Sequence, residues 1–84
     1  MGYSLKKRSE IFGKAKKIKG KNPDRYRMDN YGNVIFFNSY GLNSEMGWEI
    51  DHIKPKSKGG SDNSRNLRPL LTVKNRRKGD KYPY

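Results

Sequence analysis

The 84-residue chain contains no cysteine and only one histidine. The absence of cysteine excludes disulfide bonds and zinc sites built on cysteine ligands. A single histidine cannot supply the two imidazoles of an H-E-x-x-H zinc motif. Long apolar runs are also missing, and no stretch approaches the ~18 residues that a membrane-spanning helix needs. Because these residues and runs are absent, we expect a protein that has no zinc-cysteine site and does not cross a membrane.

The basic N-terminus lacks the apolar segment of about 7–15 residues that characterises a signal peptide. We therefore expect an intracellular protein, located in the cytoplasm or nucleoid or in a virus-infected cell. The chain is also poor in core-forming side chains, because Leu, Ile, Val and Phe together account for 15 of 84 residues. Such a chain forms one small domain. We expect bound metal or nucleic acid to contribute to its stability.

Basic side chains are plentiful and unevenly distributed. The chain has 20 Lys and Arg against 8 Asp and Glu, a formal net charge of +12. Residues 1–20 and 64–84 each contain seven basic side chains and one acidic side chain, whereas residues 21–63 contain six of each. Two basic ends predict a polyanionic partner, and nucleic acid is the commonest one. The alternative is a solvated cationic surface without a specific ligand.

Residues 1–21 are predicted to form a basic helix or tail. Ser4 is a suitable N-cap, and apolar residues recur at helical spacing through residue 18, which predicts a helix over residues 4–19. The alternative is a frayed cationic tail. Residues 22–46 predict a hairpin, with strands at 25–28 and 33–37 joined by a turn at 29–32. We expect this hairpin to act as a scaffold whose aromatic side chains pack over the core.

Residues 47–80 follow the order strand, loop, strand, helix. The first strand runs from Trp48 to the Asp51-His52 pair, and a loop follows over residues 53–64. A second strand covers residues 66–70. Thr72 is the expected N-cap of a short helix over residues 73–78, and Gly79 is the residue expected to end it. The sequence therefore predicts an α+β chain in which a helix follows two strands.

Four side chains of this unit suggest a metal-dependent reaction. Asp51 and His52 lie at the end of the first strand, and Asn75 and Lys78 share one face of the helix because they are three residues apart. If the helix packs across the strands, Asp51 and Asn75 supply two oxygen ligands to one cation. Hard oxygen donors without thiolates favour Mg²⁺ or Mn²⁺ over Zn²⁺.

His52 is the candidate general base. A free imidazole has a pKa near ~6.5 and is mainly neutral at physiological pH. It is therefore able to take a proton from a water that attacks phosphorus. We expect Lys78 to neutralise a phosphate oxygen and Asn66 to hydrogen-bond the backbone of the loop, which fixes the direction of the imidazole.

The segment EIDHIKPKSKGGSDNSRNLRPLLTVKNRRKGD closely resembles the HNH endonuclease motif. The resemblance rests on the Asp-His pair, Gly59-Gly60, Asn66-Leu67 and the Asn-x-x-Lys of residues 75–78. Their spacing also resembles that of the HNH domains of CRISPR effector nucleases. The preceding segment is similar to the lead-in of small standalone HNH proteins, some of them from phages and viruses. The resemblance covers roughly residues 22–81.

This resemblance implies a ββα-metal fold, also called a His-Me finger, over residues 47–80. The extra N-terminal hairpin and the basic helix or tail would complete a single nuclease domain over residues 1–84. The family's general base corresponds to His52, its metal ligands to Asp51 and Asn75, and its structural asparagine to Asn66. The Cys-x-x-Cys zinc pairs that brace many relatives are absent here, so the core must be held in another way.

The expected function is metal-dependent hydrolysis of phosphodiester bonds in DNA, most often double-stranded, by a monomer or a homodimer. The alternative is a non-catalytic nucleic-acid-binding module with the same fold. The basic side chains expected to contact nucleic acid are Lys14, Lys17, Lys54, Lys56, Lys58, Arg65, Arg68, Lys74, Arg76 and Arg77.

Overall fold

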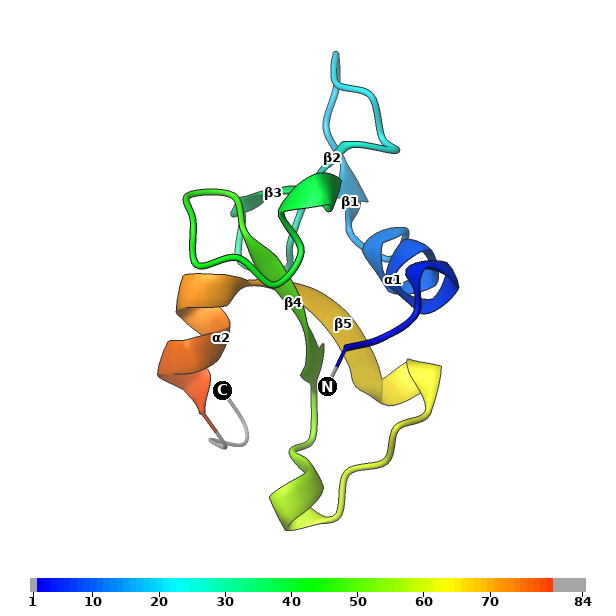
Figure 1. The fold of residues 1–84 in the computed structure, drawn as a ribbon, viewed down its shortest axis with the longest axis vertical. Helices are drawn as coiled ribbons and strands as arrows, with labels where there is room; N and C mark the ends of the chain where they lie inside the picture. Colours follow the sequence, from blue (N-terminus) through cyan, green and yellow to red (C-terminus); the bar gives the residue numbers. More distant parts are fainter. Residues whose placement is uncertain (1, 80–84) are drawn as a thin grey trace.

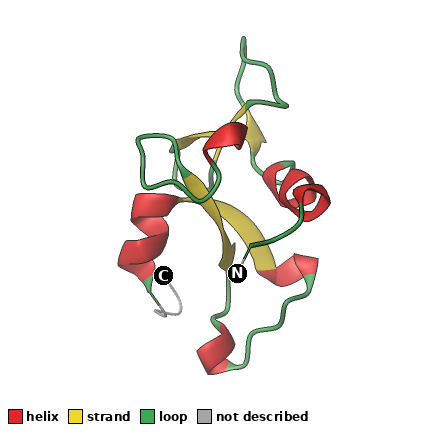
Figure 2. Ribbon diagram, in the orientation of Figure 1, coloured by secondary structure: helices red, strands yellow, loops and turns green. Residues whose placement is uncertain are grey.

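Residues 2–79 form two small antiparallel sheets, two short α-helices and three 3-10 helices of one turn each (Figures 1 and 2). A computed structural model describes residues 2–79, so the last residue of the predicted 47–80 unit lies outside the described part. The main elements are α1 (Leu5–Phe12), β1 (Lys16–Lys17), β2 (Tyr26–Met28), β3 (Val34–Phe36), β4 (Trp48–His52), β5 (Leu67–Leu71) and α2 (Thr72–Lys78). One sheet has the order β1-β2-β3, and β4 and β5 form the other. The predicted α+β class is confirmed.

Helix α1 is shorter than the sequence predicts. Its N-cap is Ser4 as expected, since the Ser4 hydroxyl accepts a hydrogen bond from the Lys7 amide at 3.1 Å. The helix ends at Phe12 and not near residue 19, because β1 pairs with β2 instead. Gly13 is a poor helix former, and the Arg27 guanidinium donates to the Gly13 and Ala15 carbonyls at 3.0 and 3.1 Å. Pairing with β2 therefore takes the place of further helical turns.

Trp48 lies at the centre of the core and is completely buried. Its indole N–H donates to the Phe37 carbonyl at 3.0 Å. Its ring packs 5.1 Å from the ring of Phe12 and 4.9 Å from that of Tyr40, measured between centroids. The core contacts of Phe37 and Tyr40 confirm that aromatic side chains of the middle segment pack over the core.

Asp29 links the first sheet to the start of α2. This buried carboxylate accepts hydrogen bonds from the amides of Tyr31 and Asn33 within its own turn, at 3.0 and 2.9 Å. It also accepts one from the Leu71 amide, 42 residues away, at 3.0 Å. The prediction of Thr72 as N-cap is wrong: the N-cap is Leu71, and within residues 2–79 the buried Thr72 hydroxyl has no hydrogen-bond partner. The carboxylate that holds the chain here is remote in sequence.

Strands β4 and β5 pair in a register that sets Asp51 opposite Arg68 and His52 opposite Leu67. The second strand starts at Leu67, one residue later than predicted, because Asn66 belongs to a preceding 3-10 turn (Ser64–Asn66). Helix α2 follows β5 directly and contacts β4. Within residues 2–79, no helix has the length and apolar character needed to cross a lipid bilayer.

Candidate active site

A pocket of about 320 Å³ opens where the end of β4, the loop between β4 and β5 and the last turns of α2 meet. Four residues that the sequence singles out line it: Asp51, His52, Asn75 and Lys78. The remaining lining residues are Ile50, Pro55, Lys56, Ser57 and Gly79. Packing of α2 against β4 thus brings together side chains that are up to 27 residues apart in the sequence.

His52 ends β4 and is paired with a carboxylate from the loop. Its Nε2 lies 2.7 Å from Oδ1 of Asp62, and the other carboxylate oxygen lies 3.0 Å from Nζ of Lys56. The pKa of Asp62 is lowered mainly by the hydrogen bond with His52 and to a smaller extent by the one with Lys56. Asp62 was not among the site residues predicted from the sequence, although it is the one carboxylate in residues 53–66.

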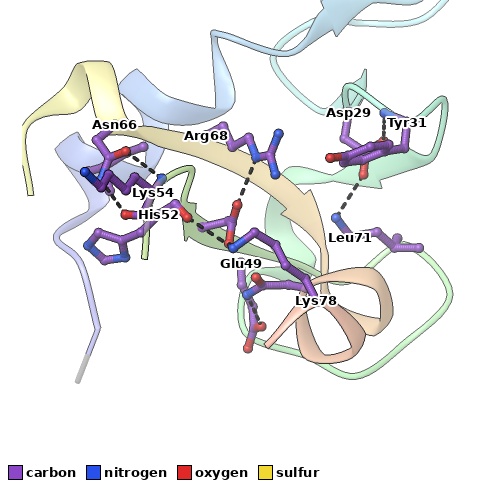
Figure 3. Close-up of polar contacts among 12 residues, drawn as sticks. Asp29, Tyr31, Glu49, His52, Lys54, Asn66, Arg68, Leu71 and Lys78 are labelled. Atoms are coloured by element: carbon purple, nitrogen blue, oxygen red, sulfur yellow. Dashed lines mark hydrogen bonds and ion pairs between the residues drawn. The ribbon is translucent and has the colours of Figure 1, made fainter. Parts of the chain in front are cut away.

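Asn66 ties together the two ends of the loop that follows His52 (Figure 3). Its amide oxygen accepts a hydrogen bond from the Lys54 amide at 2.8 Å. Its amide nitrogen donates to the carbonyls of Lys54 and Ser61 at 3.0 and 2.7 Å. Gly60 allows the loop to close, because a Cβ there would overlap the Lys54 carbonyl. The Asn66 side chain therefore holds the backbone directly after His52.

Asp51 is buried between two cationic side chains. Its Oδ2 lies 2.8 Å from Nε of Arg68, and its Oδ1 lies 3.2 Å from Nζ of Lys78. Burial lowers the pKa of Arg68, but hydrogen bonds and favourable charge interactions with Asp51 and, to a smaller extent, with Tyr31 together outweigh that effect and raise the pKa. Removal of one partner of a buried ion pair strongly destabilises a protein, because the other charge stays buried without a partner. Asp51 is therefore part of a structural ion cluster as well as of the pocket wall.

Lys78 joins α2 to the end of β4. Its ammonium donates to the His52 carbonyl at 3.2 Å in addition to pairing with Asp51, and only 2% of its side chain is exposed (Figure 3). From the sequence, this ammonium group was predicted to face a phosphate oxygen. In the structure the ammonium faces Asp51 and the backbone, so its direct role toward phosphate stays a prediction.

Asn75 reaches the same pocket from α2, and its amide nitrogen donates to Oε1 of Glu49 at 2.9 Å. Within residues 2–79, the amide oxygen of Asn75 accepts no hydrogen bond. Glu49, which also lies 3.4 Å from Arg76, is a second residue that the sequence analysis missed. The available signal was its position two residues before Asp51, which places both carboxylates on one face of β4.

The basic residues expected to contact nucleic acid fall into three groups. Arg68 pairs with Asp51, and Lys14 donates to the carbonyls of Ser64 and Leu67, so both are engaged within the protein. Lys56 and Arg76 are exposed and pair with carboxylates, and Lys74 is half-buried. The residues whose side chains are exposed and form no ion pair within residues 2–79 are Lys17, Lys54, Lys58, Arg65 and Arg77.

Comparison with known proteins gives one match. A family model described as HNH endonuclease matches residues 38–84, which is more than half of the chain. No curated protein and no solved structure matches. The matched residues contain β4, β5, α2 and the whole lining of the pocket. This chain therefore belongs to the HNH endonuclease family.

Proposed function

We propose that the protein hydrolyses phosphodiester bonds in DNA, with His52 as general base and with Asp51 and Asn75 as ligands of a divalent cation on a ββα-metal fold. Family membership implies nuclease activity and, at the level of the family, a divalent metal and a DNA substrate. The finer assignment rests on the pocket, which joins His52 to the two oxygen-bearing side chains. The observation that carries it is the contact between His52 and Asp62.

The contact with Asp62 selects which nitrogen of His52 acts as the base. The lowered pKa of Asp62 keeps its carboxylate ionised near neutral pH, and an ionised carboxylate only accepts hydrogen bonds. Nε2 of His52 must therefore carry the hydrogen in the 2.7 Å contact. In a neutral imidazole the lone pair then lies on Nδ1. Nδ1 is the atom that takes the proton from the attacking water.

The residues of the pocket fit a hard cation. The described residues hold no group of three or more His, Cys, Asp and Glu side chains able to bind a metal, so the protein would supply few ligands. Mg²⁺ suits such a site because it retains several waters and takes further ligands from phosphate. Each oxygen of Asp51 keeps a second lone pair, and the amide oxygen of Asn75 is uncommitted. A bound Mg²⁺ or Mn²⁺ would stabilise negative charge on the leaving oxygen.

Removal of metal should stop cleavage completely. We expect EDTA to abolish the conversion of supercoiled plasmid to nicked or linear forms, and excess Mg²⁺ or Mn²⁺ to restore it, because the proposed ligands are a carboxylate and an amide oxygen. The measurement is a plasmid assay across a panel of divalent metals. Restoration by Zn²⁺ alone would contradict the oxygen-ligand assignment. The absence of cleavage with every metal would favour a non-catalytic DNA-binding module.

Substitution of Asp62 by asparagine should lower kcat with little change in KM. Asparagine keeps the size of the side chain but replaces the ionised carboxylate with a neutral amide. The amide oxygen is a weaker acceptor for Nε2–H of His52, and the amide NH2 can instead donate to Nε2 and stabilise the other tautomer. We expect kcat to fall about 10-fold, a part of the ~10²–10⁴-fold that general base catalysis contributes. Steady-state cleavage of a labelled duplex measures both constants.

The matched control is Glu45→Gln, which makes the same charge change at an exposed position outside both the pocket and the other basic surfaces. The control should retain the kcat of the wild type. Asp62→Glu should recover part of the lost rate, because a carboxylate is again available to accept from His52. Equal kcat values for Asp62→Asn and the wild type would contradict a positioning role for Asp62.

A further inference from the structure

A basic hairpin, here defined as residues 16–25, comprises β1 and its connection to β2. Its cationic side chains are Lys16, Lys17, Lys19, Lys21 and Arg25, and all five are exposed. Within residues 2–79 none of them forms an ion pair, and Asp24 is the hairpin's single carboxylate. Ile18 is half-buried, so the hairpin offers no large apolar side chain to a partner. Such a surface suits a polyanion better than a protein interface, which needs an apolar centre.

The basic hairpin is held in place and does not behave as a loose tail. Arg27 on β2 donates to the carbonyls of Pro23 at 2.8 Å, Gly13 at 3.0 Å and Ala15 at 3.1 Å, which fixes both sides of the hairpin to the end of α1. The amide of Lys21 also donates to the Ile18 carbonyl at 3.1 Å. The cations therefore project from a defined backbone, which limits the entropy lost when they bind a ligand.

The basic hairpin and the candidate active site lie at opposite parts of an elongated molecule. In Figure 1 the connection between β1 and β2 is at the top, while the loop between β4 and β5 is at the bottom. The longest dimension of the molecule is 38 Å, so the distance between the two surfaces is at most the length of about 11 base pairs of B-form DNA at 3.4 Å each. The hairpin also lies outside residues 38–84, the part that matches the family model.

We propose that the basic hairpin is a second DNA-binding surface, which contacts backbone phosphates about one helical turn from the bond that the active site cuts. This proposal rests on the proposed function, because it takes duplex DNA as the substrate. Lys and Arg side chains bind phosphate oxygens without reading sequence. The hairpin thus favours duplexes that extend about 10 base pairs beyond the scissile bond on one side.

The test is DNA binding by the 84-residue chain in EDTA, measured by fluorescence anisotropy on duplexes of about 8 to 20 base pairs. The variant replaces Lys16, Lys17 and Lys19 with glutamine. A longer duplex offers more binding positions, which alone raises the apparent affinity by a statistical amount. We expect the affinity of the wild type to rise by more than this amount once the duplex is long enough to reach the hairpin. Affinity of the triple variant should rise only by that statistical amount.

Salt dependence gives a second readout on the long duplex. Loss of three phosphate contacts should reduce the magnitude of the slope of log K against log salt concentration by about 2.7. The ratio of the binding constants of the wild type and the triple variant should therefore fall about 40-fold between 50 and 200 mM salt. Lys19→Gln alone should reduce the slope by about 0.9. The matched control, Lys6→Gln on the exposed side of α1, should leave the slope unchanged.

Equal losses of affinity at every duplex length would overturn the proposal, because they would indicate a general charge effect. A triple variant with the slope and the length dependence of the wild type would overturn it as well. Thermal unfolding of each variant checks that these exposed substitutions leave the fold intact. Binding in EDTA needs no cleavage, so a protein that binds as predicted but never cuts DNA would refute the proposed function and not the hairpin contact.

Discussion

Replacement of His52 by alanine should abolish cleavage of plasmid DNA. Without the imidazole, the pocket has no suitable general base among its described residues, since the negative charge of Asp51 is already balanced by Arg68 and Lys78. Loss of a general base lowers the rate by about 10²–10⁴-fold. A single-turnover assay at saturating enzyme measures the chemical step, and anisotropy in EDTA shows whether DNA binding is retained.

The matched control for this variant is Asn30→Ala, a polar side chain removed from an exposed turn outside the pocket. The control should cut DNA at the rate of the wild type. Because the His52 side chain is partly exposed, its removal leaves a small gap and the melting temperature should change little. Cleavage by His52→Ala at the wild-type rate would refute the assignment of the base.

Replacement of Asp51 by alanine should destabilise the protein by about 3–5 kcal/mol, because it leaves buried cations without their partner. The side chains of Lys78 and Arg68 are only 2% and 13% exposed, so water does not replace the lost carboxylate. Small domains have about 5–15 kcal/mol of stability, so this substitution would remove a large share of the free energy of unfolding. Urea unfolding followed by Trp48 fluorescence measures the loss.

The double variant Asp51→Ala with Lys78→Met separates stability from activity. Methionine removes the buried charge and keeps most of the side-chain volume, so the double variant should regain part of the lost free energy of unfolding. Cleavage should remain absent in both variants, because the proposed metal ligand is missing. If the double variant were no more stable than Asp51→Ala, the unpaired charge of Lys78 would not be a cause of the lost stability. Recovery of cleavage would contradict Asp51 as a metal ligand.

The order strand, loop, strand, helix was predictable because local signals define it. Alternating strand residues precede His52, glycines mark the loop and Gly79 ends α2. The spacing of His52, Asn66 and Asn75 identified the resemblance to the family, and the family model now supports it. These features depend on residues that are close in sequence, where backbone preferences act directly.

The remaining features depend on partners that are distant in sequence. The end of α1 is set by pairing with β2 and by Arg27, and the start of α2 is set by Asp29. In the same way Arg68 resembles a surface cation until the register of β4 and β5 places it opposite Asp51. Local periodicity contains no information on such contacts, so these parts of the prediction failed or stayed incomplete.

The shared core has a practical consequence for protein engineering. Trp48 and Leu67, which lie inside the family-matched segment, pack against Ile11, Phe12 and Ile35, which lie outside it. A fusion that grafts only residues 38–84 onto another scaffold would deprive those two side chains of these three apolar neighbours. The nuclease module of this chain is therefore portable only together with the N-terminal segments that complete its interior.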